Sequence, residues 1–153
     1  GVIYAPAHGD LYAGWGEGEA IKYSDSTGAE KPIKVRAIPR EGFTIVTNRT
    51  KDYSGRLEHF LERFKINKTL RLGSSLKICM IAAGKADLYP RFGPISEWDI
   101  AAGDAILRSA GGSLVTMTGV AVTYGHTDKK FRSPEFVASS GQIPVADLLD
   151  IAE

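Results

Sequence analysis

The chain alternates between runs of β-branched and aromatic residues and segments whose apolar residues recur at helical spacing. Strand patterns cover residues 1–6, 10–23, 43–48, 69–72, 86–92, 113–119, 120–125 and 135–140. Helical patterns cover 54–64, 74–84 and 99–110, and a final helix is expected from about Pro144. Because the helices fall between strands, the pattern predicts an α/β fold, a layered mixed sheet with flanking helices. The length of 153 residues suits one domain.

Shorter signals refine this prediction. Glycines at positions 14, 16 and 18 do not have the spacing of a phosphate loop, and no helix follows them, so we expect a hairpin there. The polar stretch 24–40 reads as a loop with one short strand at 33–36. His59 is expected on the surface of its helix rather than as a metal ligand.

Charge is nearly balanced, and this narrows the class of partner. The formal net charge is +1, so no bulk positive field indicates nucleic acid, and any anion must be bound by a few placed residues. The single Cys79 excludes a disulfide framework, and no apolar run is long enough to cross a membrane. We therefore expect a cytoplasmic protein, with the inner membrane surface as the alternative location.

The segment "LGSSLK" (72–77) places two hydroxyls and a lysine at the start of a helix that follows a strand. Unpaired N–H groups and the helix dipole favour negative charge at such an end. Ser74 or Ser75 can be a plain N-cap, with Lys77 in solvent. A lysine in the first turn opposes the dipole, however, and this mismatch indicates an anion. The residues alone leave both interpretations open.

The segment "WDIAAGD" (98–104) opens the next helix with a carboxylate. Asp99 is well placed as the N-cap, and capping alone explains it. Small residues keep the first turn thin, so a ligand can approach, and Trp98 can bury the flank. An aspartate can offer its second oxygen to Mg²⁺, but one carboxylate does not make a magnesium site. From the residues alone, capping is favoured.

Arg91 lies in "LYPRFGP" (88–94), between a strand and a loop containing Gly and Pro. Flanked by Tyr89 and Phe92, it can act as a phosphate fork beside an aromatic platform. It can equally be an edge-strand residue that extends its guanidinium into water. Pro90 cannot donate a ladder hydrogen bond, so we expect it at a sheet edge or a strand end.

The stretch "WDIAAGDAILRSAGG" (98–112) combines Trp-Asp, small residues, an apolar helix and Ala-Gly-Gly. It resembles the second signature of the inositol monophosphatase superfamily of Mg²⁺-dependent phosphomonoesterases. The segments "GVIYAP", "LGSSLKICMIAAGKADLYPRFGP" and "FVASSG" are similar to its bacterial 3'(2'),5'-bisphosphate nucleotidase branch, and the resemblance covers nearly the whole chain. It implies the C-terminal α/β subdomain of the sugar-phosphatase fold, and hydrolysis of adenosine 3',5'-bisphosphate to AMP and phosphate.

The resemblance also implies residue roles. Asp99 would be a Mg²⁺ ligand beside the reacting phosphate, and so both a catalytic and a substrate-binding residue. Ser74, Lys77 and Arg91 would bind the nucleotide and its non-reacting phosphate. Asn48 and Arg49 fall near another substrate-contacting segment.

Part of the family pattern is missing. The first signature, Asp-Pro-(Ile or Leu)-Asp-Gly-Thr, and an upstream Glu supply the other metal ligands in the family, and this sequence lacks them. We therefore expect residues 1–153 to form a single C-terminal subdomain whose N-terminal metal-binding half lies outside the chain. Alone, the chain is expected to be inactive. Its first strand is expected to associate with another chain or with that missing half.

Two other functions stay open. The nearest is a phosphatase for inositol phosphates or fructose bisphosphate, although a substrate with one phosphate would leave Lys77 or Arg91 without a partner. The missing acidic motif favours a second alternative, a catalytically silent fragment that binds a nucleotide or a protein partner. In the favoured interpretation the partner is a small bisphosphorylated nucleotide and not nucleic acid.

Overall fold

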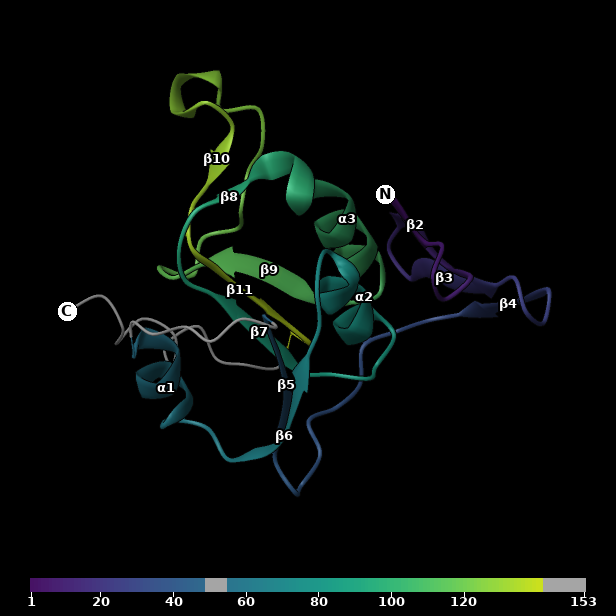
Figure 1. Cartoon of the computed structure of the whole chain (residues 1–153), viewed down its shortest axis with the longest axis horizontal. Coiled ribbons are helices and arrows are strands. Elements are labelled where there is room, and N and C mark those ends of the chain that lie inside the picture. Colours follow the sequence, from purple (N-terminus) through teal and green to yellow (C-terminus); the bar gives the residue numbers. More distant parts are fainter. Residues whose placement is uncertain (49–54, 142–153) are drawn as a thin grey trace.

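The computed structural model describes residues 1–48 and 55–141. This part of the chain forms a mixed α/β architecture with three sheets (Figure 1). The helices are α1 (Arg56–Leu61), α2 (Leu76–Ala82) and α3 (Ala101–Ser109), with 3-10 turns η1 (Glu97–Asp99) and η2 (Thr127–Lys129). The strands are β1 (Val2–Ala5), β2 (Asp10–Gly16), β3 (Glu19–Ser24), β4 (Ala29–Pro32), β5 (Phe43–Thr47), β6 (Ile66–Arg71), β7 (Leu88–Arg91), β8 (Ile95–Ser96), β9 (Ser113–Thr116), β10 (Arg132–Ser133) and β11 (Phe136–Ser139).

A five-stranded sheet with the order β6-β5-β7-β11-β9 forms the centre of the fold. Strand β5 pairs in parallel with β6 and β7, whereas β11 pairs antiparallel with β7 and β9. Side chains alternate between the two faces, as strand geometry requires. Ile45 and Leu88 pack with Phe60 of α1 on one face, while Val46 and Tyr89 join the core formed with α2 and α3. The sheet is therefore covered by helices on both faces.

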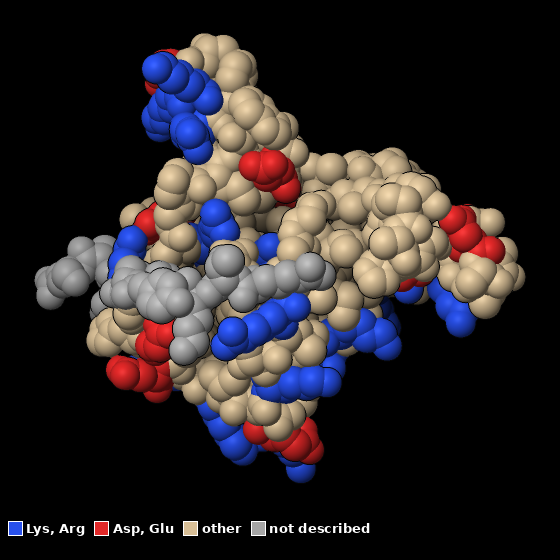
Figure 2. All heavy atoms as spheres, in the orientation of Figure 1, with Lys and Arg blue, Asp and Glu red and all other residues tan. Residues whose placement is uncertain are grey.

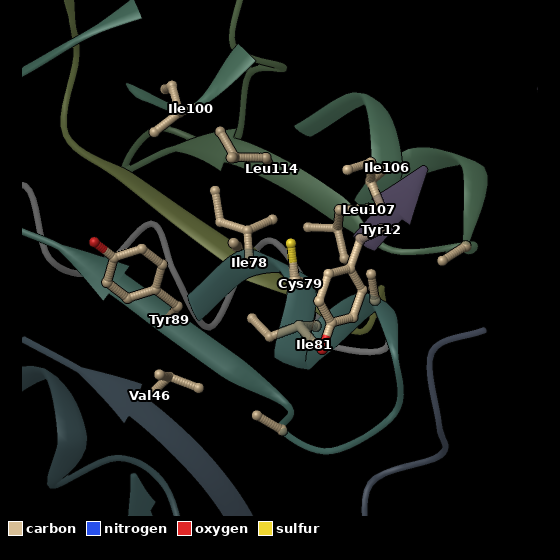
Figure 3. Packing of buried hydrophobic residues seen from close by; sticks show 14 of the residues in the cluster. Tyr12, Val46, Ile78, Cys79, Ile81, Tyr89, Ile100, Ile106, Leu107 and Leu114 are labelled. Atoms are coloured by element: carbon tan, nitrogen blue, oxygen red, sulfur yellow. The ribbon is translucent and has the colours of Figure 1, made fainter. Parts of the chain in front are cut away.

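The opening strands form a second sheet, an antiparallel meander in the order β1-β2-β3-β4. It packs on the other side of α3, so the layers run α1, five-stranded sheet, α2 with α3, and meander (Figure 1). Figure 3 shows Tyr12 of β2 inserted into the core beside Cys79, Ile81 and Leu107. Gly14 permits this contact, because an added Cβ would lie 2.9 Å from the Ile106 Cα.

Several local predictions are confirmed. The glycines at 14, 16 and 18 belong to the β2–β3 hairpin, with Gly18 at a φ of 75° in its turn. The ring of His59 is on the surface, where its Nδ1 lies 3.4 Å from a carboxylate oxygen of Glu62. No helix in the described ranges is long and apolar enough to cross a membrane. The helix expected from about Pro144 lies outside the described residues.

Other local predictions are wrong. The short strand lies at Ala29–Pro32 rather than at 33–36, because the hairpin with β3 fixes its register. Residues 120–125 form no strand; the only pairing there is one bridge between Val115 and Ala121. Helix α1 ends at Leu61, although the apolar pattern continues to Phe64, whose ring still packs on Phe43. Apolar spacing reports burial, and burial does not require the helix to continue.

Strand β7 lies inside the sheet, so the expectation of an edge is wrong, whereas Pro90 is the last residue but one of β7, in agreement with the alternative of a strand end. The pairing with β5 is limited to Ile45 and Leu88, so it ends before Pro90. On the other side, Pro90 lies opposite Val137 of β11. An interior strand tolerates this proline because no partner on the β5 side requires its missing N–H.

A buried ion pair fixes the connection that leads from the meander to the central sheet. Asp87, fully buried before β7, accepts hydrogen bonds from Arg36 Nε at 2.8 Å and Nη2 at 2.9 Å. It also accepts one from the Thr44 backbone N–H at 2.7 Å. The hydrogen bonds to Asp87 raise the pKa of Arg36. Every charge in this cluster has a partner.

Candidate functional site

A pocket of about 530 Å³ opens where α2, β7 and the β8–η1 turn meet. All four residues singled out in the sequence line it, although they come from three separate elements. The structure therefore brings Ser74, Lys77, Arg91 and Asp99 into one recess. The remaining lining residues are Asn48, Ser75, Ile78, Tyr89, Pro94, Ile95, Ser96, Trp98, Ile100 and Arg132.

Lys77 is buried in the first turn of α2, with 5% of its surface exposed. Its Nζ donates a hydrogen bond to the Ser74 carbonyl oxygen at 2.9 Å and lies 5.1 Å from the centre of the Tyr89 ring. Burial, together with the nearby charge of Arg91, lowers the pKa of Lys77 to about 8. No carboxylate in the described ranges pairs with it. The interpretation of a lysine in solvent is therefore wrong.

The two serines before α2 do not cap the helix in the ordinary way. Ser75 occupies the N-cap position but has helical backbone angles, and its side chain makes no capping hydrogen bond. Ser74 has a φ of 59°, in the left-handed region that non-glycine residues rarely adopt. The two hydroxyl oxygens lie 3.4 Å apart at the pocket. Both hydroxyls can therefore contact a ligand.

Arg91 ends β7 beside Lys77. Its Nη2 donates to the Pro94 carbonyl oxygen at 3.3 Å, and its Nε is buried without a hydrogen-bond partner among the described residues. A buried donor without a partner costs free energy. The edge-strand alternative is wrong, because β7 lies inside the five-stranded sheet, and the guanidinium is half-buried at the pocket.

Asp99 does cap a turn, but its position differs from the prediction. It is the last residue of η1, and α3 begins after it at Ala101. Its Oδ2 accepts a hydrogen bond from the Ser96 N–H at 3.2 Å, in a capping box with Ser96 as the N-cap. The carboxylate is exposed at the pocket. A short 3-10 turn precedes the helix here, and the sequence pattern did not reveal it.

Trp98 does not bury the flank of this site. It is 69% exposed and lines the pocket, with its ring centre 6.0 Å from that of Phe131. Tyr89, expected as an aromatic platform beside Arg91, lines the pocket, whereas sequence reasoning missed Arg132. The basic and aromatic run "KKFR" (129–132) was the available signal for Arg132. Asn48 does line the pocket, whereas Arg49 lies outside the described residues.

The described residues do not form a complete metal centre. Within the ranges 1–48 and 55–141, no three His, Cys, Asp or Glu side chains gather closely enough to hold an ion. Among these residues, Asp99 is the one acidic side chain that lines the pocket. Mg²⁺ in proteins takes near-octahedral oxygen coordination. Asp99 can therefore supply one ligand, and this part of the chain cannot supply the full set.

Comparison with known proteins identifies the family to which this architecture belongs. Residues 1–144 match the model of the inositol monophosphatase family. The chain is 39% identical over 141 residues to the 3'(2'),5'-bisphosphate nucleotidase CysQ of Buchnera aphidicola, covering 92% of this chain and 51% of that protein. It is 36% identical over 139 residues to CysQ of Escherichia coli K12, covering 91% and 54%. The chain thus spans about half the length of these relatives.

Solved structures agree with this family match. CysQ from Bacteroides thetaiotaomicron, a bacterial member of the inositol monophosphatase family, superposes with a TM-score of 0.73 at 29% identity, covering 93% of this chain and 58% of that one. An inositol monophosphatase from Zymomonas mobilis has the same TM-score at 19% identity and supports the fold alone. The fold matches the C-terminal part of these structures. The chain belongs to the inositol monophosphatase family.

Proposed function

We propose that this chain is the substrate-binding part of a 3'(2'),5'-bisphosphate nucleotidase, which hydrolyses adenosine 3',5'-bisphosphate to AMP and phosphate. The observation that carries the proposal is the pocket in which Ser74, Lys77, Arg91 and Asp99 meet. The identity of 36–39% to CysQ nucleotidases supports it. The proposal includes a cytoplasmic location, since the lone buried Cys79 suits a reducing compartment.

Lys77 and Arg91 are proposed to bind the non-reacting phosphate. The two cations lie close enough for the charge of Arg91 to lower the pKa of Lys77. Neighbouring like charges in a partly buried site destabilise each other, and a dianionic phosphate removes this cost. It would also accept hydrogen bonds from the guanidinium of Arg91, which lines the same pocket. The Ser74 hydroxyl adds a neutral donor at the same place.

Asp99 is proposed to be one Mg²⁺ ligand. Only its Oδ2 is used by the contact with Ser96, and the carboxylate is exposed to the pocket, so its position suits an oxygen ligand. We infer that the other ligands come from an N-terminal half outside this chain. When bound, Mg²⁺ would neutralise phosphate charge and activate a water molecule.

Hydrolysis in this site would be an in-line displacement. A water oxygen would form a bond to the phosphorus and lose a proton, while the bond from phosphorus to the ribose oxygen breaks and the ribose oxygen takes up a proton. The chain's own residues act by placing the substrate. Lys77 and Arg91 hold one phosphate so that the other lies at Asp99, and such positioning contributes to the rate by removing the entropy cost of orientation.

A phosphate-release assay tests the proposal. The purified 153-residue chain, with excess Mg²⁺ and adenosine 3',5'-bisphosphate, is expected to show negligible turnover. Activity is expected once the upstream half is supplied, either in one chain or as a separate fragment. Robust, Asp99-dependent turnover by the 153-residue chain alone would show that the metal site is misplaced.

Comparison substrates separate the alternatives. The longer protein is expected to prefer adenosine 3',5'-bisphosphate to inositol 1-phosphate and fructose 1,6-bisphosphate. A preference for either of these other substrates would contradict the nucleotidase proposal and would favour a phosphatase for inositol phosphates or fructose bisphosphate. Tight nucleotide binding without turnover by the longer protein would indicate a silent binding protein.

A further inference from the structure

Another wall of the same pocket carries a cation that the proposed function leaves unused. Arg132 lies on β10, which pairs antiparallel with β8 so that Arg132 is opposite Ser96. Ser96 is the N-cap of the turn that contains Asp99, so the sheet register places Arg132 beside the Asp99 side of the pocket. Its guanidinium has no ion pair or hydrogen bond among the residues that the structure describes. Arg132 is therefore available to a ligand.

The segment that delivers Arg132 is fixed by a buried carboxylate. Glu97, the first residue of η1, has a nearly buried side chain. It accepts hydrogen bonds from the backbone N–H groups of Gly125 at 2.6 Å and His126 at 3.1 Å. The His126 Nδ1 also lies 2.7 Å from Glu97 Oε1. Residues 117–133, here called the arm, are thus attached to the turn that carries Asp99.

A second buried carboxylate holds the arm to α3. Asp104 accepts hydrogen bonds from the Tyr124 hydroxyl at 2.7 Å and from Arg108 Nε at 2.9 Å. Arg108 Nη2 in turn donates to the Val122 carbonyl oxygen at 3.0 Å. Charge-assisted hydrogen bonds of this kind are among the stronger polar contacts in proteins. The arm is therefore fixed at two points, and Arg132 extends from a defined position.

The exposed side of the arm is basic and partly aromatic. Lys129, Lys130 and Arg132 are all exposed, and Figure 2 shows the Lys and Arg side chains gathered on the projecting arm. The neighbouring rings of Trp98 and Phe131 are exposed by 69% and 38%. Of the three cations, Arg132 is the one that lines the pocket.

We propose that Arg132 is a further substrate-binding residue, which contacts the reacting phosphate from the β8–β10 wall while Lys77 and Arg91 hold the other phosphate. This inference rests on the proposed function. Each phosphate monoester carries about −1.5 to −2 charges at neutral pH. Two such groups carry more negative charge than Lys77 and Arg91 balance. Arg132 supplies a third cation, and its planar guanidinium can donate two hydrogen bonds to one phosphate.

Binding measurements on the 153-residue chain test this without requiring turnover. Trp98 lines the pocket and reports on it by fluorescence, and a Trp15→Phe background removes the other tryptophan of the chain. Adenosine 3',5'-bisphosphate and inorganic pyrophosphate are the two probes, with dissociation constants checked by calorimetry. Arg132→Gln is expected to weaken binding of both about tenfold, because one charge-assisted contact is lost.

Lys129→Gln is the matched control, since it removes the same charge from the same arm at a residue that does not line the pocket. It is expected to change the dissociation constants less than about twofold, because salt screens exposed charges. Glu97→Gln is expected to weaken binding as Arg132→Gln does. When Glu97→Gln is combined with Arg132→Gln, the dissociation constants are expected to rise little beyond those of Arg132→Gln alone, because both changes would remove the same contact.

The outcomes separate this inference from the proposed function. Unchanged affinity in Arg132→Gln, or an equal loss in Lys129→Gln, overturns the role of Arg132 while leaving the nucleotidase proposal standing. Arg132-dependent binding of pyrophosphate without any binding of the nucleotide keeps the role of Arg132 as an anion contact and overturns the nucleotide substrate. Additive losses in the double variant overturn the positioning role of Glu97.

Discussion

Asp87 and Lys77 are both buried ionisable residues close to β7, yet among the residues that the structure describes only Asp87 has a partner of opposite charge. Asp87 accepts three hydrogen bonds, two of them from the guanidinium of Arg36. Lys77 donates to one carbonyl oxygen and has Arg91, another cation, as its charged neighbour. The first cluster is electrostatically complete, and the second is not.

The difference supports the proposal that the Asp87 cluster stabilises the fold and that Lys77 and Arg91 bind a ligand. A buried charge with a full set of partners connects elements, as Asp87 connects residue 36 to β5. The buried Lys77 and the partly enclosed Arg91, which have no carboxylate partner among the described residues, reduce stability in the free protein by repelling each other. A phosphate would remove this cost, and the predictions below test the contrast between the two clusters.

The largest effect is expected from Asp87→Ala. The substitution leaves the buried Thr44 N–H and the partly exposed guanidinium of Arg36 without their acceptor. An unsatisfied buried donor costs about 1–3 kcal/mol, and a hydrogen bond to a charged group contributes about 1.5–3 kcal/mol. The pair between Lys22 and Asp10 is the control, because its aspartate is partly exposed whereas Asp87 is fully buried, and Asp10→Ala is expected to cost about 0–1 kcal/mol. Urea unfolding of the 153-residue chain measures both. Equal losses would show that the Asp87 cluster is no more important than a surface pair.

Asp99→Asn tests the pocket that contains Lys77, because Asp99 lines the same pocket. Asparagine can still accept the hydrogen bond from the Ser96 N–H, so the unfolding free energy is expected to stay nearly constant. A metal ion is worth several kcal/mol to the transition state, so turnover by the longer protein is expected to fall at least about a hundredfold. The Mg²⁺ requirement is expected to rise. Normal activity at ordinary Mg²⁺ would leave Asp99 with a capping role only.

Lys77→Ala and Arg91→Ala are expected to have a smaller effect that depends on the substrate. Each charge-assisted contact contributes about 1.5–3 kcal/mol, so binding of adenosine 3',5'-bisphosphate should weaken by that amount. A small generic phosphate ester lacks the second phosphate and should be spared. Steady-state kinetics on both substrates measures this. Equal losses on the two substrates would show that these residues do not discriminate.

The smallest effect is expected from pH. The pKa of Lys77 is lowered to about 8, so the free site carries the ammonium below that pH and loses it above. Nucleotide affinity should therefore fall as pH rises through about 8, in a range where phosphate, with a second pKa of about 6, is already fully charged. Lys77→Arg stays charged and should remove the dependence. A flat profile in the unchanged protein would contradict the shifted pKa.

The fold was predictable where local pattern and tertiary contacts agree. The alternation of strands and helices and the β2–β3 hairpin followed from apolar spacing and turn residues. The interior position of β7 did not, because whether Pro90 is tolerated depends on how far β5 extends along it. Residues 120–125 carry a strand pattern but have no neighbouring strand beyond a single bridge. Strand formation needs a partner, and local sequence does not specify one.

The candidate site was also predictable only in part. Residue types alone identify the side chains that could bind phosphate and metal, since they set the hydroxyl, ammonium, guanidinium and carboxylate groups. The folded chain is needed to show that Lys77 is buried and that the Arg91 Nε has no hydrogen-bond partner among the described residues. Only the β8–β10 pairing brings Arg132 beside Asp99, across 33 positions of sequence. Desolvation and proximity are properties of packed surfaces, and they appear only when distant segments meet.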